Sequence, residues 1–312
     1  MKQLYILAIA LLTTIGLSAQ TILYSNDFEN DTGDATIVGN GAIVEEETAG
    51  FGSVFHNAAG GQAIRSNYLL LPDNIFAQLQ ESGSKELSIA FWVNKGTAVD
   101  QLWTPIFSAY GAAPVNNANT WPMMVLQSRL VGQVNNSGWT DLTDAQNTNG
   151  TNTVDVEWLD DEAWHFYTAT FTESEVKVYI DGEVKNTWTL SGDENGSSVS
   201  GLFNNGSALT YICLGGNQAW DWADPDPAYK FDDLAIYSSL LNADQIEAII
   251  AAKSGTAVNQ FDFSGEVVKE EFFSITGAKA GNDFKRLQRG IYIKKSTFSN
   301  GAVNSSKIVK MQ

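Results

Sequence analysis

Tryptophan residues occur close to aspartate or asparagine in stretches of the chain that are rich in turn-forming residues. An indole ring offers a large, rigid apolar surface that can stack on the C–H face of a sugar ring. Aspartate and asparagine beside it can hydrogen-bond the sugar hydroxyls. The pattern predicts that a glycan contacts six loop residues, Trp121, Trp139, Trp220, Asp221, Trp222 and Asp224. The alternative is that these loops fold back and bury their own indoles.

The chain contains no convincing set of residues for catalysis. Its two histidines, His56 and His165, suggest neither a zinc site nor a Ser-His-Asp arrangement. Glycoside hydrolysis needs two carboxylates about 5–10 Å apart. Glu173 and Glu175 are close in sequence, but Lys177 beside them indicates a solvated strand edge. We therefore expect a protein that is not an enzyme. A carboxylate pair from distant strands would leave no signature, so a glycan-active enzyme stays an alternative.

Charge is distributed unevenly along the chain. Residues 21–255 contain 8 basic and 31 acidic residues, whereas residues 256–312 contain 9 basic and 5 acidic residues. Binding to nucleic acid or to an anionic membrane needs clusters of lysine and arginine, so the acidic body argues against both. An acidic body is compatible with neutral glycans and with calcium, and simple solubility explains it equally well.

The N-terminus has the features of a secretory signal peptide. Lys2 supplies a positive start, residues 4–17 are an almost unbroken apolar run, and Ser18-Ala19 provides small residues for cleavage. The run is shorter than the ~20 residues of a membrane span. We expect residues 1–19 to be removed and the mature protein to be exported, without a transmembrane span. The only cysteine, Cys213, lies in an apolar stretch and is expected to be buried and inert.

Short strands dominate the expected secondary structure. Alternation places Leu87, Ile89, Phe91 and Val93 on one face of a strand, and Asp181-Gly182 predicts a tight hairpin between the strands 175–180 and 185–190. Further strands are expected near 22–28, 64–71, 104–109, 123–131, 164–171, 209–214 and 230–237. This spacing predicts an all-β protein, a two-sheet antiparallel jelly-roll sandwich.

Two helices are expected to interrupt the strands. Asp73 can cap a short helix that runs through Gln80. Asn242 and Gln245 form a capping pair ahead of an apolar helix that Gly255 closes. This second helix marks the end of the sandwich, so the expected domains are 20–255 and 256–312.

Several segments in order resemble the laminin-G-like, concanavalin A-like jelly-roll family. The segments are Leu87–Val93, Pro105–Ser108, Ala163–Phe171, Val178–Gly182, Leu214–Gly216 and Phe231–Leu241. The resemblance covers about residues 21–253 and implies two facing antiparallel sheets. Members of that family bind glycans or proteins, so the fold leaves the function open. Trp92, Trp164 and His165 fall in the strand motifs and are expected to be packing residues.

The same resemblance implies that the first and last strands are neighbours and that a structural calcium ion can lie beside them. Asp27 and Glu29 follow the first strand, and Asp232 lies in the last. Calcium takes six to eight oxygen ligands, commonly carboxylates and main-chain carbonyls. We expect Asp27, Glu29 and Asp232 to be its ligands. The loop with Asp221, Asp224 and Asp226 is a rival position, and hydrated surface carboxylates are the alternative to both.

The C-terminal segment resembles a type IX secretion sorting domain over about residues 258–312. The matching stretches are Val268–Gly277, Gly290–Ile293 and Thr297–Lys310, although the proline-containing opening of that family is missing. The resemblance implies recognition by the type IX machinery and passage across the outer membrane of a Gram-negative bacterium. A small structural β-domain is the alternative.

Taken together, these features predict a secreted or cell-surface carbohydrate-binding module that recognises glycans without catalysis. A structural or adhesive surface protein that binds other proteins is the first alternative. A glycoside hydrolase or polysaccharide lyase is the second.

Overall fold

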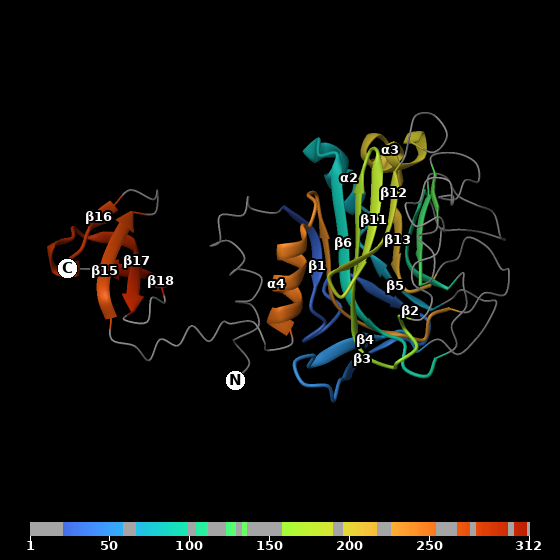
Figure 1. Ribbon diagram of the computed structural model, residues 1–312, viewed down its shortest axis with the longest axis horizontal. Coiled ribbons are helices and arrows are strands. Elements are labelled where there is room, and N and C mark those ends of the chain that lie inside the picture. Colours follow the sequence, from blue (N-terminus) through green and yellow to red (C-terminus); the bar gives the residue numbers. More distant parts are fainter. Residues whose placement is uncertain are drawn as a thin grey trace. The chain divides into compact units, whose positions relative to one another are not determined.

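The computed structural model describes residues 21–58, 67–98, 104–111, 123–128, 133–135, 158–189, 196–216, 226–253, 267–274, 279–298 and 303–310 (Figure 1). The chain divides into two compact units, one that ends at Ile250 and one that begins at Ala251. The first unit is a sandwich of two antiparallel sheets and confirms the predicted fold class. No helix in the described part of the chain is long and apolar enough to cross a membrane.

An eight-stranded sheet forms one layer of the sandwich. Its order is β12-β11-β10-β6-β14-β4-β3, and β1 also pairs with β14. The strands are β1 (Ile22–Asn26), β3 (Ala42–Glu45), β4 (Ser53–His56), β6 (Glu86–Asn94), β10 (His165–Thr172), β11 (Glu175–Ile180), β12 (Glu183–Thr189) and β14 (Lys230–Tyr237). The predicted Asp181-Gly182 turn joins β11 to β12, with both residues at positive φ.

A six-stranded sheet forms the other layer, in the order β2-β5-β13-β7-β8-β9. Its strands are β2 (Thr36–Val38), β5 (Tyr68–Leu71), β7 (Pro105–Tyr110), β8 (Met123–Gln127), β9 (Gln133–Asn135) and β13 (Tyr211–Leu214). The main core lies between the sheets and includes Leu87, Ile89, Phe91 and Val93, as the alternation in β6 predicts. Cys213 is buried, and burial raises the pKa of its thiol.

In the described part of the sandwich, three α-helices accompany the sheets, where the sequence predicted two. α2 (Ile75–Ser82) begins after Asn74, which makes no side-chain cap, so the expected cap at Asp73 is wrong. α4 (Ala243–Lys253) has the expected reciprocal cap between Asn242 and Gln245, at 2.8 and 2.9 Å. α3 (Gly196–Asn204), followed by the short helix η2 (Gly206–Ala208), was not predicted because its residues are mostly weak helix formers.

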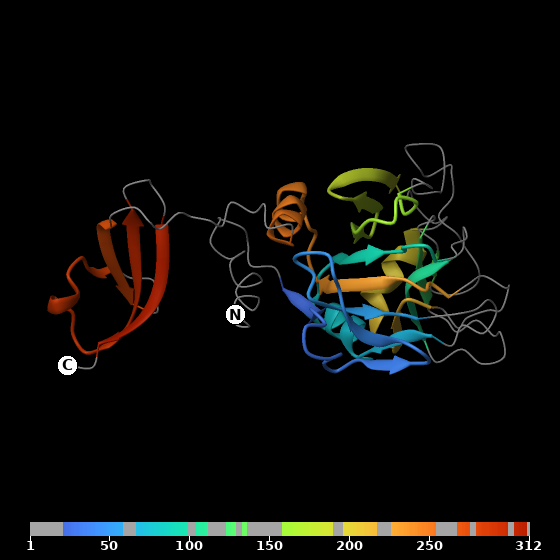
Figure 2. The ribbon, with the colours of Figure 1, turned by 90° about the horizontal axis from the view of Figure 1, so that it is seen from below.

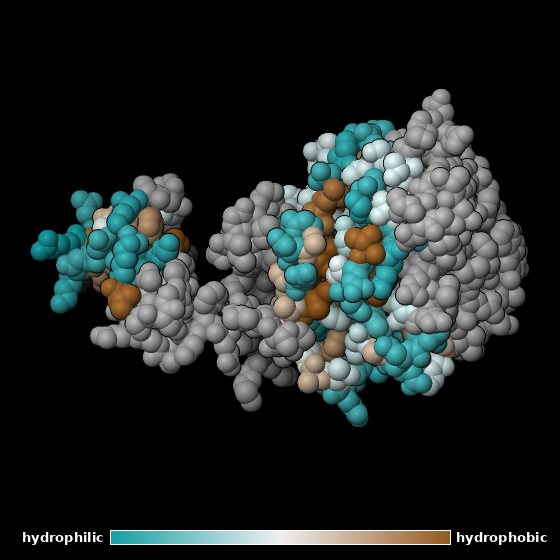
Figure 3. Space-filling view, in the orientation of Figure 1, coloured by the Kyte–Doolittle hydropathy of each residue, from teal (hydrophilic) through white to brown (hydrophobic). Residues whose placement is uncertain are grey.

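A second apolar cluster covers the outer face of the eight-stranded sheet. Trp92 and Phe166 pack there with Ile246 of α4, which lies on that face (Figure 2). Trp164 stacks on Phe51 with ring centroids 4.2 Å apart. The sequence-based interpretation of Trp92 and Trp164 as packing residues therefore agrees with the structure. Apolar side chains stay visible beside α4 in the space-filling view (Figure 3). Val184 of β12, which pairs with Tyr179, is 52% exposed.

The C-terminal unit is a four-stranded antiparallel sheet in the order β16-β15-β17-β18. Its elements are β15 (Val267–Ser274), β16 (Lys279–Gly281), η3 (Phe284–Arg286), β17 (Gly290–Phe298) and β18 (Val303–Lys310). Phe272 is buried and packs against Phe284. The Lys310 ammonium donates to the carbonyls of Phe284 and Lys285 at 2.9 and 2.6 Å, which ties the last strand to η3.

Candidate ligand-binding site

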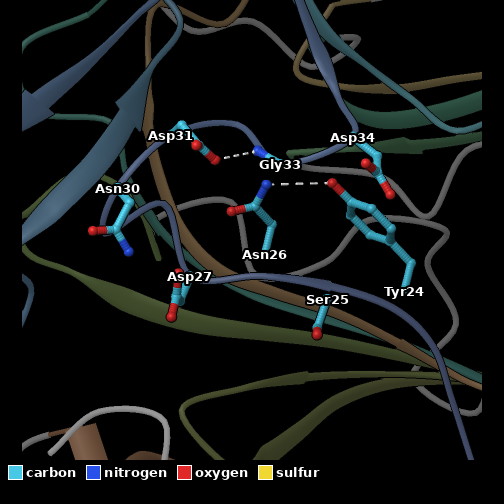
Figure 4. Close-up of a pocket in the computed structure, with 8 residues that line it drawn as sticks. All are labelled: Tyr24, Ser25, Asn26, Asp27, Asn30, Asp31, Gly33 and Asp34. Atoms are coloured by element: carbon cyan, nitrogen blue, oxygen red, sulfur yellow. Dashed lines mark hydrogen bonds between the residues drawn. The ribbon is translucent and has the colours of Figure 1, made fainter. Parts of the chain in front are cut away.

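A pocket of about 370 Å³ opens beside the end of β1 (Figure 4). It is lined by eight residues of β1 and the loop that follows it, Tyr24, Ser25, Asn26, Asp27, Asn30, Asp31, Gly33 and Asp34. The lining combines one aromatic ring with carboxylate, amide and hydroxyl groups. This is the mixture of groups expected where a polar ligand with an apolar face is bound.

Local hydrogen bonds give the loop its shape. The Asn26 side chain accepts from the Phe28 N–H at 2.8 Å and donates to the Thr32 carbonyl at 2.7 Å. Asp31 accepts from the Gly33 N–H at 2.7 Å, in the way that aspartate commonly builds turns (Figure 4). Phe28 is fully buried in the main core and anchors the loop. The loop that forms the pocket wall is therefore fixed by its own hydrogen bonds and by the burial of Phe28 in the core.

Tyr24 supplies the pocket's aromatic surface and a hydroxyl group. Burial raises the pKa of Tyr24, the hydrogen bond from Asn26 opposes this, and the charge of Asp34 adds to the rise. The phenol therefore stays neutral at physiological pH and can donate a hydrogen bond. Asn30 and Asp34 are exposed at the rim. The pocket thus offers both acceptors and donors to a hydroxyl-bearing ligand.

Two of the predicted calcium ligands, Asp27 and Asp232, lie on neighbouring strands or directly after one. β1 pairs with β14, so the expected adjacency of the first and last strands is confirmed. Asn26 lies opposite Leu234, which brings Asp27 next to the bulge of β14 that contains Asp232. Asp27 lines the pocket, whereas Asp232 is fully buried in the sheet and accepts from the Asp233 N–H at 2.9 Å.

The third predicted ligand, Glu29, places its carboxylate against Gly52, where a methyl group would collide with it. Among the described residues, no group of three or more histidine, cysteine, aspartate or glutamate side chains is placed to hold a metal ion. Asp27, Glu29 and Asp232 therefore do not form a three-carboxylate centre by themselves. A calcium ion at this place would need amide or main-chain oxygens as well, and the pocket contains Asn26 and Asn30.

The six residues predicted to contact a glycan lie outside the described part of the chain: Trp121, Trp139, Trp220, Asp221, Trp222 and Asp224. Of the rival calcium loop, only Asp226 is described. Its carboxylate is buried and accepts from the main-chain and side-chain N–H groups of Asn67, both at 3.3 Å. Asp226 is therefore fixed by hydrogen bonds to Asn67, the residue directly before β5.

The sequence of the sandwich assigns the chain to a family. A sequence model of the concanavalin A-like lectin/glucanases superfamily, Laminin_G_3, matches residues 62–247. The chain belongs to this superfamily. The match confirms the resemblance of the body of the chain. It does not reach residues 256–312, so their resemblance to a type IX sorting domain stays a prediction. No curated protein matches the chain.

Solved structures align with the chain at low identity. Domain 4 of AbnA, a GH43 extracellular arabinanase from Geobacillus stearothermophilus, in complex with arabinotriose, is 19% identical with a TM-score of 0.43, over 74% of this chain and 98% of that chain. The binding domain of botulinum neurotoxin DC in complex with rat synaptotagmin II is 13% identical with a TM-score of 0.47, over 91% and 73%. Trypanosoma rangeli sialidase with the inhibitor DANA is 14% identical with a TM-score of 0.37, over 69% and 28%.

Members of the superfamily include both lectins and glucanases, so membership alone does not assign catalysis.

The sequence analysis missed a cluster of polar residues on the outer face of the six-stranded sheet. It consists of Tyr68, Ser108, Tyr110, Gln127 and Tyr211. The hydroxyls of Tyr68 and Tyr211 share a hydrogen bond. The alternation of tyrosine with core leucine and isoleucine in β5 and β13 could have revealed this face. Only Tyr211 of the group is partly exposed, so the pocket beside β1 is the more accessible site.

Proposed function

We propose that this chain is a non-catalytic, carbohydrate-binding module of the concanavalin A-like superfamily. The observation that carries the proposal is the pocket beside β1. It combines the aromatic surface of Tyr24 with the hydrogen-bonding groups of Asn30 and Asp34 on a loop anchored in the core. The superfamily match supports the proposal because lectins are among its members.

We also propose that the loop tryptophans extend this recognition. Trp121, Trp139, Trp220 and Trp222 would stack on further sugar rings, and Asp221 and Asp224 would hydrogen-bond their hydroxyls. The support for this part is the sequence pattern.

A glycan array screened with the full chain tests the proposal. We expect binding to one class of neutral glycan and at least a tenfold loss of affinity in the double variant Asn30→Ala, Asp34→Ala. Both side chains are exposed, so this change should leave the fold intact. Asp73→Ala, which removes an exposed carboxylate outside the pocket, is the matched control and should bind normally.

The outcomes separate the parts of the proposal. Unchanged binding by the double variant, with loss in Trp220→Ala, Trp222→Ala, would exclude the pocket and leave the tryptophan loop as the site. No binding to any glycan would overturn the proposed function and favour recognition of other proteins.

We propose calcium as the ion that supports the pocket, with Asp27 as a ligand and with Glu29 and Asp232 as the further carboxylates that the sequence predicts. The support is the set of carboxylate and amide oxygens at this place, which suits a hard cation. An ion that binds only the folded state raises the melting temperature. We expect added calcium to raise the melting temperature of the full chain and Asp27→Asn to abolish this rise. An identical melting temperature in calcium and in chelator would exclude the ion.

Export to the surface of a Gram-negative bacterium is the cellular part of the proposal. The support is the signal-peptide pattern of residues 1–19 and the formation of a separate β-sheet unit by the C-terminal segment. In a host with type IX machinery, we expect the full chain at the cell surface and a chain without residues 256–312 in the periplasm. Surface delivery of the truncated chain would contradict the sorting role.

A further inference from the structure

His165 lies between two carboxylates at the start of β10. Its Nδ1 is 2.7 Å from Asp181 Oδ2, and its Nε2 is 2.9 Å from Asp161 Oδ1. Both ring nitrogens therefore face acceptors. The imidazole side chain is only 12% exposed, whereas Asp161 is 60% exposed. Both carboxylates reach solvent, and Asp161 is the more exposed of the two, since the Asp181 side chain is 44% exposed.

Asp181 is the held partner. It belongs to the β11–β12 turn, and its Oδ1 accepts from the Phe166 N–H at 2.8 Å. Its own N–H donates to the Phe166 carbonyl at 2.9 Å. The turn also touches the outer helix, because Gly182 lies near Ile246 and Ile250 of α4. The Asp181 side chain therefore cannot leave His165 without losing its hydrogen bond from the Phe166 N–H, and the main-chain bond keeps its Cα beside β10.

Asp161 is the movable partner. Its Oδ1 also accepts a local hydrogen bond, from the Ala163 N–H at 2.9 Å. Residues 158–164 connect parts of both sheets, since Trp158 donates to the Ser128 carbonyl at 2.7 Å and Asn94 donates to the Glu162 carbonyl at 3.0 Å. Loss of the Asp161 contact would loosen one attachment of this segment and leave the others in place.

The number of protons on the ring decides which contacts are favourable. A doubly protonated imidazole donates from both nitrogens and satisfies both carboxylates. A neutral imidazole has one N–H, so a lone pair must then face a carboxylate at less than 3 Å. We expect the proton to stay on Nδ1, because Asp181 is the closer carboxylate and its other oxygen accepts from the Phe166 N–H. The repulsion then falls on Asp161, which is exposed and can rotate away.

We propose that His165 is a pH-sensitive clasp: with both nitrogens protonated it joins residues 158–164 to the β11–β12 turn, and with a neutral ring it releases Asp161. This device belongs to the sandwich itself and does not rest on the proposed glycan site.

The charged surroundings of the ring support this assignment. Asp181 faces it from the hairpin turn and Asp161 from its own segment, while its β6 neighbour is the uncharged Val93. Trp158 presents its ring at 5.7 Å in an edge contact. Burial works against a positive charge here, but the hydrogen bonds with Asp181 and Asp161 outweigh it, so the pKa of His165 lies above its ordinary value. Release is therefore expected above the ordinary histidine pKa of about 6.5.

Nuclear magnetic resonance of the two histidines in the full chain tests the proton assignment, with His56→Gln to separate their signals. We expect His165 to titrate above about 6.5 and to keep its proton on Nδ1 when neutral. A titration at or below that value, or a neutral ring protonated on Nε2, would overturn the clasp.

Hydrogen exchange of residues 158–164 tests the release. After correction for the intrinsic pH dependence of exchange, we expect at least threefold less protection at pH 8.5 than at pH 5.5. Asp161→Asn should remove this difference, because its amide can donate to the unprotonated Nε2 or accept from the protonated one. Glu162→Gln removes a negative charge from an exposed side chain of the same segment and should keep the difference. Equal protection at both pH values in the unmodified chain, or loss of the difference in both variants, would overturn the proposal.

Discussion

At Gly216, just after β13, the fold requires a residue without a side chain. Its φ is +91°, and an added Cβ would lie 2.9 Å from the Tyr68 Cβ and would clash with the Asn67 carbonyl. Main-chain atoms cannot move aside at low cost. We expect Gly216→Ala to lower the free energy of unfolding by about 3 kcal/mol or more, measured by urea denaturation.

Gly83 provides the control for this prediction. Its φ of +72° is similarly left-handed, but nothing lies within 4 Å of an added Cβ. Gly83→Ala should therefore cost only the conformational penalty, about 1 kcal/mol. Equal losses in the two variants would show that backbone conformation, and not the collision with Asn67 and Tyr68, determines the cost.

The two histidines should affect stability with opposite dependence on pH. The raised pKa of His165 means that its contribution is fully present below about 6.5 and is lost as the pH rises through its higher folded value. Relative to His165→Gln, we expect the unmodified chain to be more stable at pH 6 than at pH 9 by about 1 kcal/mol or less, because Asp161 is exposed. Urea denaturation at both pH values measures the difference.

His56 is the internal comparison for that experiment. Burial and then the charge of Lys230 lower its pKa, although the Ala228 main chain opposes them. Its contribution is therefore lost as the pH falls through its depressed folded value. The difference between the unmodified chain and His56→Gln should accordingly shrink toward low pH, opposite to His165.

At the scale of the element, β12 combines an exposed and a buried position at the edge of the eight-stranded sheet. Trp188 is fully buried in the main core, whereas Val184 is 52% exposed. We expect Trp188→Ala to lower the free energy of unfolding by about 3–5 kcal/mol through lost burial and a cavity. Val184→Ser on the same strand should change it by less than about 0.5 kcal/mol, so a large loss there would mean that the edge is covered in solution.

The strands that could be predicted are those with a local signal. Alternation located β6, and the Asp-Gly pair located the turn between β11 and β12. β2, β3, β4 and β9 were missed, because three or four residues are too few to show a clear alternation of apolar and polar side chains. Helix α3 was missed for a different reason: Val199, Leu202 and Phe203 are buried and stabilise it despite weak local propensity.

The pocket beside β1 could be predicted only in part. Asp27 was singled out as an oxygen ligand, and it lines the pocket. Tyr24 and Asp34 were not singled out, because only the turn centred on Asp31 and Gly33 brings the loop back over the strand. A turn of this kind depends on side-chain hydrogen bonds such as those of Asn26, which leave no periodic pattern in the sequence.

At the scale of the whole molecule, each unit has buried apolar side chains of its own. Among the described side chains of the C-terminal unit, Phe272 in β15 and Leu287 after η3 are buried. A sheet of this size has little apolar burial to lose. We expect Phe272→Ala to increase hydrogen exchange in β15, β17 and β18 at least tenfold while leaving exchange in β6 unchanged. Equal increases in both sheets would show that the units unfold together.

The single thiol of the chain lies in the sandwich, where Cys213 is 1% exposed and its pKa is raised by burial. Alkylating reagents attack the thiolate, so Cys213 does not react with them while β13 stays paired with β5 and β7. Each labelled molecule therefore records one opening of the sandwich and none of the C-terminal sheet. Mass spectrometry of alkylated Cys213 therefore measures the rate at which the sandwich opens in the chain without any substitution.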